Sequence, residues 1–130
     1  MFKKGVNMQK REENKPPAAL EKWGWKYHHL GVPTTQKMPN EIYLAHLKFA
    51  VSGFQESPFG IEWMRFDEDC PLPEIIQTVP HLAFQVDNLE KAIHQARCKI
   101  IAEPIKPASG IRTAMIEHNG APIELIEFTQ

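Results

Sequence analysis

The sequence predicts an α+β domain built from two related modules that are rich in strands, and three observations lead to this prediction. HLGV over residues 29 to 32 recurs as HLAF over 81 to 84, and IEWMRF over 61 to 66 recurs as IELIEF over 123 to 128. Apolar and polar residues alternate over much of both halves, as is typical of strands. A clear helical pattern follows only the second repeated histidine. We therefore expect β-α-β-β-β in module two and a shortened or missing helix in module one.

Length and composition favour one globular domain that can bury a core without disulfides or a structural metal ion. The 130 residues are 42% hydrophobic and 24% charged, which is ordinary for a soluble protein. Residues 1 to 22 are rich in Lys, Glu, Asn and Pro, so we expect a flexible N-terminal tail there and a single domain over 23 to 130.

The same composition argues against several classes of partner. Lys and Arg number 15 against 16 Asp and Glu and are interspersed beyond the N-terminus, so no nucleic-acid footprint is indicated. The chain has neither the roughly 20 consecutive apolar residues of a spanning helix nor the apolar core of a signal peptide. Its two cysteines, Cys70 and Cys98, form neither a CxxC pair nor a disulfide framework. We expect a cytoplasmic protein with free thiols and no membrane partner.

Module one, at about residues 25 to 67, is predicted to contain strands only. Pro33 ends the first strand because proline cannot donate to a ladder, and the alternation after Glu41 fits one long strand or two joined by a bend. The predicted strands cover residues 26 to 32, 41 to 52 and 61 to 66. The connection over 67 to 78 is expected to hold a short helical turn over 74 to 77.

Module two, at about residues 79 to 128, carries the expected helix. Leu89, Ala92 and Ala96 recur at helical spacing, and Asp87 with Glu90 forms a capping-box pattern at its start. Asn119-Gly120 is a strong hairpin signal between the last two strands. The predicted strands cover residues 79 to 86, 99 to 103, 111 to 117 and 121 to 128.

Each half opens with a histidine and closes with a glutamate. Because side chains alternate along a strand, His29 and His81 point away from the apolar face, as Glu62 and Glu124 do at the other end of their modules. Imidazole nitrogen and carboxylate oxygen together suit borderline and harder divalent metals. We predict that these four side chains converge on one divalent ion, and Zn, Ni, Mn, Co and Fe are not distinguished.

The remaining polar residues of the strands are given weaker roles. His28 is adjacent to His29, so strict alternation predicts that it faces the other way and is structural. Five further side chains are candidate pocket walls, with a solvated or core position as the alternative: His46, Lys48, Gln85, Thr113 and Met115.

The pattern resembles the vicinal oxygen chelate superfamily, which includes glyoxalase I, methylmalonyl-CoA epimerase, extradiol dioxygenases and bleomycin or fosfomycin resistance proteins. The resemblance covers residues 26 to 128 and rests on HLGV at 29, GIE at 60, PHLAFQVD at 80 and PIEL at 122. It implies two βαβββ modules that form a curved mixed sheet around a metal-binding cleft. It also implies that the ligands are His29, Glu62, His81 and Glu124.

The resemblance implies a metal-dependent isomerase or lyase that moves a proton on a small oxygenated substrate. The metal would stabilise an enediolate as a Lewis acid, and Glu62 or Glu124 would be the catalytic base. No set of basic residues matches the carboxylates of glutathione. The alternatives are an Fe(II) extradiol-type dioxygenase that uses both histidines and one glutamate, and a non-catalytic binding or resistance protein. A homodimer is also expected.

Overall fold

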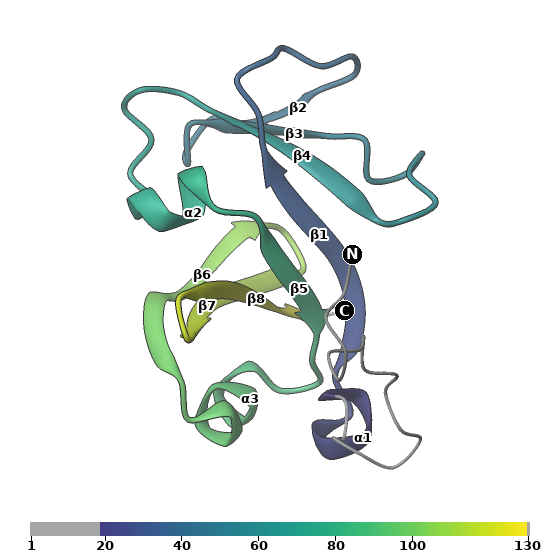
Figure 1. Cartoon of the computed structure of the whole chain (residues 1–130), viewed down its shortest axis with the longest axis vertical. Helices are drawn as coiled ribbons and strands as arrows, with labels where there is room; N and C mark the ends of the chain where they lie inside the picture. Colours follow the sequence, from purple (N-terminus) through teal and green to yellow (C-terminus); the bar gives the residue numbers. More distant parts are fainter. Residues whose placement is uncertain (1–18, 130) are drawn as a thin grey trace, which may run out of the picture.

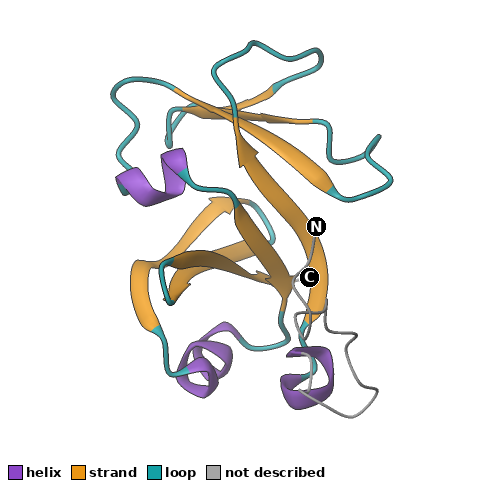
Figure 2. Ribbon diagram, in the orientation of Figure 1, coloured by secondary structure: helices purple, strands orange, loops and turns teal. Residues whose placement is uncertain are grey.

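The computed structural model describes residues 19 to 129, which form one curled sheet of eight strands with few helices (Figures 1 and 2). The strand order is β2-β3-β4-β1-β5-β8-β7-β6, with both parallel and antiparallel neighbours. The predicted α+β class and curved mixed sheet are therefore confirmed. Residues 1 to 18 of the predicted tail lie outside the described residues. Among residues 19 to 129, no helix is both long and apolar enough to cross a membrane.

The observed elements follow the sequence prediction closely in order and type. Those before residue 80 are α1 (Ala19–Trp23), β1 (Lys26–Pro33), β2 (Ile42–Leu44), β3 (Phe49–Ser52), β4 (Ile61–Phe66) and α2 (Glu74–Thr78). Those after it are β5 (His81–Gln85), α3 (Leu89–Ala96), β6 (Lys99–Ala108), β7 (Ile111–His118) and β8 (Ala121–Phe128).

The segment over 41 to 52 is two strands, which confirms the second of the two predicted alternatives: Lys48 takes a left-handed φ of 57° and turns the chain between β2 and β3. The larger differences from the prediction lie in β6, which continues from the predicted end at residue 103 to Ala108, and in α1. Residues 19 to 22, which the sequence assigns to the tail, belong to α1. Trp23 of this helix lies 4.6 Å from Trp25, ring centre to ring centre, so α1 packs onto the core.

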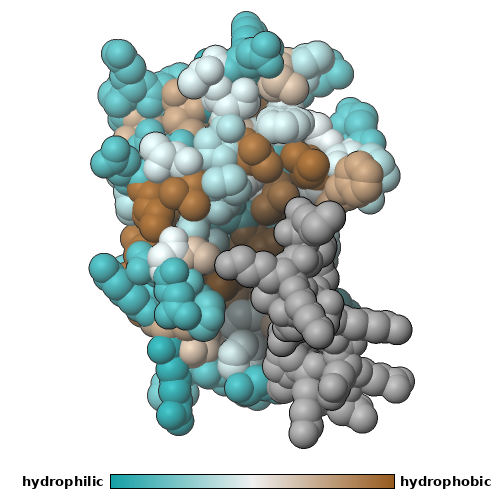
Figure 3. All heavy atoms as spheres, in the orientation of Figure 1, coloured by the Kyte–Doolittle hydropathy of each residue, from teal (hydrophilic) through white to brown (hydrophobic). Residues whose placement is uncertain are grey.

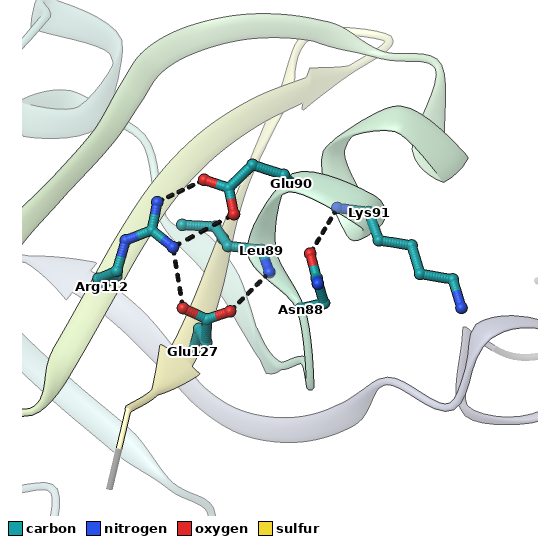
Figure 4. Close-up of polar contacts among 6 residues, drawn as sticks. All are labelled: Asn88, Leu89, Glu90, Lys91, Arg112 and Glu127. Atoms are coloured by element: carbon teal, nitrogen blue, oxygen red, sulfur yellow. Dashed lines mark hydrogen bonds and ion pairs between the residues drawn. The ribbon is translucent and has the colours of Figure 1, made fainter.

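Helix α3 begins one residue later than its capping signal indicates (Figure 4). The N-cap is Asn88, whose side-chain oxygen accepts from the Lys91 backbone N–H at 2.9 Å. The predicted capping box of Asp87 and Glu90 is therefore wrong. Glu90 instead turns outward and pairs with Arg112 of β7.

A carboxylate from the last strand completes this helix start. Glu127 of β8 accepts from the Leu89 backbone N–H at 3.0 Å and from Arg112 at 3.0 Å (Figure 4). Helix α3 is thus tied to β7 and β8, where Leu89 and Leu125 are fully buried. This packing fixes the second half of the sheet from one side.

The centre of the sheet determines where the predicted ligands meet. β1 pairs with β4 in parallel and with β5 in antiparallel, and β5 pairs with β8 in parallel. The four central strands β4, β1, β5 and β8 are therefore contiguous within one chain. Each of them carries one predicted ligand: Glu62, His29, His81 and Glu124 respectively.

Candidate metal centre

Strand register places the four predicted ligands in one neighbourhood. Gly31 of β1 is opposite both Glu62 of β4 and His81 of β5. Ala83 of β5 is opposite both His29 of β1 and Glu124 of β8. Two small residues thus sit in the positions between the four larger side chains, which reach over them toward each other.

Three of the four side chains form a compact group that could hold a metal ion. Oε1 of Glu124 lies 3.2 Å from Nε2 of His29 and 3.1 Å from Nε2 of His81. One ligand atom from each of the three residues lies within 4.8 Å of the others. Glu62 stands beside the group, with its Oε1 3.5 Å from Nε2 of His29. The structure therefore separates Glu62 from the other three predicted ligands.

The glycine in HLGV is required by the second histidine. A Cβ built on Gly31 would lie 2.1 Å from Cε1 and 2.5 Å from Nε2 of His81. Such distances are far below van der Waals contact, and His81 is only 1% exposed, so its ring has little room to move. The imidazole of His81 therefore lies directly over the backbone of β1 in a space that only glycine leaves open.

The chemistry of this group fits a divalent cation. His29 and His81 are buried. Among the described residues, Nδ1 of His81 has no hydrogen-bond partner, and Nε2 of His29 lies 3.2 Å from Oε1 of Glu124 without the alignment of a hydrogen bond. An unsatisfied buried polar atom costs about 1 to 3 kcal/mol, and a cation between the two imidazoles and Glu124 would relieve that of His29. Two imidazoles and one carboxylate are ligands that Zn, Fe, Co, Ni and Mn share.

The two glutamates have different electrostatic environments. Burial alone would raise the pKa of Glu124, but the imidazoles of His29 and His81 outweigh it and lower this pKa to about 2. Burial raises the pKa of Glu62, which His29 only partly offsets. Burial also opposes a charge on His29, yet the Glu124 and Glu62 carboxylates raise its pKa. Glu124 is therefore held as a carboxylate, whereas Glu62 accepts a proton more readily.

These pKa shifts predict how the stability of the metal-free protein depends on pH. The lowered pKa of Glu124 contributes stability above its ordinary value of 4.5, and this is lost as the pH falls toward 2. The raised pKa of His29 contributes stability below pH 6.5, and this stability is lost as the pH rises through the folded-state pKa. We therefore expect Glu124→Gln to lower the free energy of unfolding most, by about 3 kcal/mol, between pH 4.5 and 6.5.

Urea unfolding of the wild type and of the Glu124→Gln variant, in the presence of a chelator and from pH 3 to 8, measures this loss of stability. The difference between their free energies of unfolding should become smaller below pH 4.5 and above pH 6.5. A gap that stays constant over the whole range would contradict the assigned pKa shifts.

His28 lies on the same side of β1 as His29, so the predicted opposite orientation is wrong. The pairing of β1 with β5 slips between Tyr27 and His29, and this irregularity breaks the alternation of side chains. Nδ1 of His28 lies 2.8 Å from Nδ1 of His29, and the His28 ring stacks on Phe54 with centroids 4.8 Å apart. Strict alternation could not reveal this, because the sequence carries no signal for the bulge.

This contact predicts a supporting role for His28 in metal binding. With Nε2 of His29 facing the cluster, its Nδ1 can donate to Nδ1 of His28, and such outer hydrogen bonds orient ligating imidazoles. His28→Phe, which keeps an aromatic ring against Phe54, should weaken zinc binding by about 10-fold. Calorimetric titration checks this, with His94→Phe on the exposed face of α3 as the control. Equal affinities for the two variants would exclude the role.

The cluster forms part of the wall of a cavity of about 200 Å³. The curl of the sheet brings β3 and β4 opposite β6 and β7, and side chains from both ends of the sheet line the space. Apolar residues line most of the rest of it, including Leu44, Leu47, Val51, Met64, Ile76 and Ile111. On the face of the molecule that Figure 3 shows, apolar side chains gather in the middle.

Only two of the five candidate pocket residues line this cavity. Thr113 and Met115 of β7 do so. Lys48 does not, because it lies in the turn after β2, where alternation does not apply, and pairs with Asp69. His46 is exposed in the same turn, and Gln85 lies at the end of β5 far from His81. The walls from α2 and β6 were not predicted, since their contribution depends on the curl of the sheet.

Neither the protein-family models nor the curated proteins contain a match to this chain.

Proposed function

We propose that this protein is a metal-dependent enzyme of the vicinal oxygen chelate superfamily that acts on a small oxygenated substrate by isomerisation, epimerisation or lyase-type proton transfer. One observation carries the proposal. Three potential ligands, with Glu62 beside them, come from four adjacent strands and lie in the wall of a cavity large enough for a small molecule.

The strand order supports the assignment to two modules. The half-sheet β2-β3-β4-β1 has the same internal order as β6-β7-β8-β5, and the two meet where β1 pairs with β5. In each half, the strand that carries the repeated histidine pairs in parallel with the strand that carries the repeated glutamate. This arrangement matches the repeat in the sequence, with the short segment between β1 and β2 in place of the first helix.

The geometry favours different roles for the four residues. His29, His81 and Glu124 would hold the metal ion, which supplies Lewis-acid stabilisation of negative charge on a substrate oxygen. Glu62 lies beside this group and also lines the cavity, so it can reach a substrate without leaving a tight ligand set. It would take the proton from the carbon next to the carbonyl group and return it to the product.

Metal content tests the proposal. Protein purified without added metal should retain close to one divalent ion per chain, measured by elemental analysis. His81→Ala should lower the affinity by orders of magnitude, because it removes a buried ligand that the cluster cannot replace. His118→Ala, which alters an exposed residue, is the matched control. Wild-type protein that neither retains metal nor binds it in titration would refute the proposal and favour a binding protein.

An Fe(II) dioxygenase is the second candidate, and the separation of Glu62 favours it. His29, His81 and Glu124 have the composition of the two-histidine, one-carboxylate triad of non-haem iron oxygenases, and these residues would hold Fe(II) and leave positions open for O₂ and substrate. Anaerobic reconstitution with Fe(II), followed by measurement of O₂ uptake with ring diols, distinguishes this activity. Proton exchange without O₂ uptake would support the first candidate instead.

A further inference from the structure

We infer that the substrate has an apolar body without an anionic group, about the size of one six-membered ring, attached to the oxygens that face the metal centre. This inference rests on the proposed function and narrows it to a class of substrate. It follows from three properties of the cavity: the charges of its walls, its volume and the position of the metal centre within it.

The cavity contains no cationic side chain that could hold a second anionic group. Its lining includes three histidines and three glutamates but, among residues 19 to 129, no Lys or Arg. With a divalent ion bound, the charges of Glu62 and Glu124 would balance that of the ion, and the exposed Glu103 would add one further negative charge to the lining. A phosphate or carboxylate on the far part of the substrate would therefore lose its hydration without gaining an ion pair.

The volume sets the size of the apolar body. An apolar cavity of about 150 Å³ is enough to hold a benzene molecule. The cavity here measures about 200 Å³, which leaves room for one ring and a short chelating group. Long substrates with a nucleotide, a peptide or several rings would have to extend into solvent.

The chelating end and the apolar end of the cavity are distinct. His29, His81 and Glu124 come from the central strands, whereas Leu47, Ile76 and Ile111 come from the turn after β2, from α2 and from the start of β7. A substrate whose oxygens face the metal centre would thus direct its body toward these apolar side chains. Burial of one ring there should raise the affinity by about 10-fold to 100-fold.

Three hydroxamic acids test this inference on zinc-loaded protein, because a hydroxamate chelates a metal through two adjacent oxygens. Benzohydroxamic acid carries an uncharged ring, 4-carboxybenzohydroxamic acid carries the same ring with a negative charge, and acetohydroxamic acid has no ring. In calorimetric titrations, the uncharged ring compound should bind at least about 10-fold more tightly than each of the other two.

A charge introduced into the cavity wall should change this order. Leu47→Lys places a cation at the apolar end, and it should improve binding of the 4-carboxy compound while weakening binding of benzohydroxamic acid. Ala45→Lys adds the same charge on the same turn but outside the cavity, and it should leave the order of the three compounds unchanged. Zinc titration of each variant precedes the hydroxamates and confirms that it is folded.

The outcomes separate this inference from the proposed function. If zinc binds but the three compounds bind equally, or the charged one binds best to the wild type, the inference is overturned and the metal centre stands. If Leu47→Lys and Ala45→Lys have the same effect, the apolar end is not where the ring lies, and the inference is overturned as well. Absence of zinc binding in the first titration overturns the proposed function together with the inference.

Discussion

Gly31→Ala is expected to weaken metal binding by at least about 100-fold and to lower the free energy of unfolding of the metal-free protein by about 3 kcal/mol. The added Cβ would lie 2.1 Å from the ring of His81, so either this imidazole or strand β1 must shift. A buried ring that moves by an ångström no longer shares a centre with His29 and Glu124. Zinc titration and urea unfolding measure the two effects.

A double-mutant cycle makes this prediction specific. His81→Ala removes the ring that the new methyl group meets, so Gly31→Ala should cost little stability in that background. The affinity for zinc stays low in the double variant, because a ligand is missing. Equal stability costs of Gly31→Ala with and without His81 would show that the glycine is needed for another reason.

The predictability of the centre follows from how directly the repeat encodes it. HLGV and HLAF place His29 and His81 on neighbouring strands, and Gly31 has no Cβ where the second copy has Ala83, because β1 passes under His81. Strand alternation then gives the correct face for Glu62 and Glu124. The alternation of side chains is therefore sufficient to predict these ligand positions where the pairing of the strands is regular.

The errors arise where tertiary contacts override local pattern. His28 turns toward His29 because β1 slips against β5, and nothing in the residues around it marks this bulge. Asn88 displaces Asp87 as the cap because Glu127, 40 positions beyond Asp87, already accepts the first N–H of α3. The cavity walls from α2 and β6 likewise depend on the curl of the whole sheet, which no short segment encodes.

The last prediction distinguishes the two glutamates, which the repeat alone treats as equivalent. Glu124 lies between the two imidazoles, at 3.2 and 3.1 Å, and its direct contacts with them lower its pKa to about 2 despite its burial. Within residues 19 to 129, Glu62 forms an ion pair with His29 alone, at 3.5 Å, and burial raises its pKa. A group that must take a proton from the substrate, and need not hold the metal, is better served by the second environment.

We therefore expect opposite phenotypes for the two glutamine variants. Glu124→Gln should reduce zinc affinity by at least about 100-fold, because it removes the negative ligand shared by both histidines. Glu62→Gln should leave zinc affinity within about 10-fold of the wild type but slow proton transfer by about 100-fold or more. Both changes preserve side-chain shape, so thermal melting should show that the fold is retained.

Exchange of the α-protons of 2-hydroxyacetophenone in D₂O, followed by NMR on zinc-loaded protein, measures the proton transfer directly. This probe has adjacent oxygens and one uncharged ring, and its exchange needs a base but no completed isomerisation. Loss of exchange in Glu62→Gln with zinc still bound would assign the base to Glu62. If that variant exchanges protons at the wild-type rate with zinc bound, Glu62 is not the base, and the dioxygenase that uses only His29, His81 and Glu124 becomes the better account of this site.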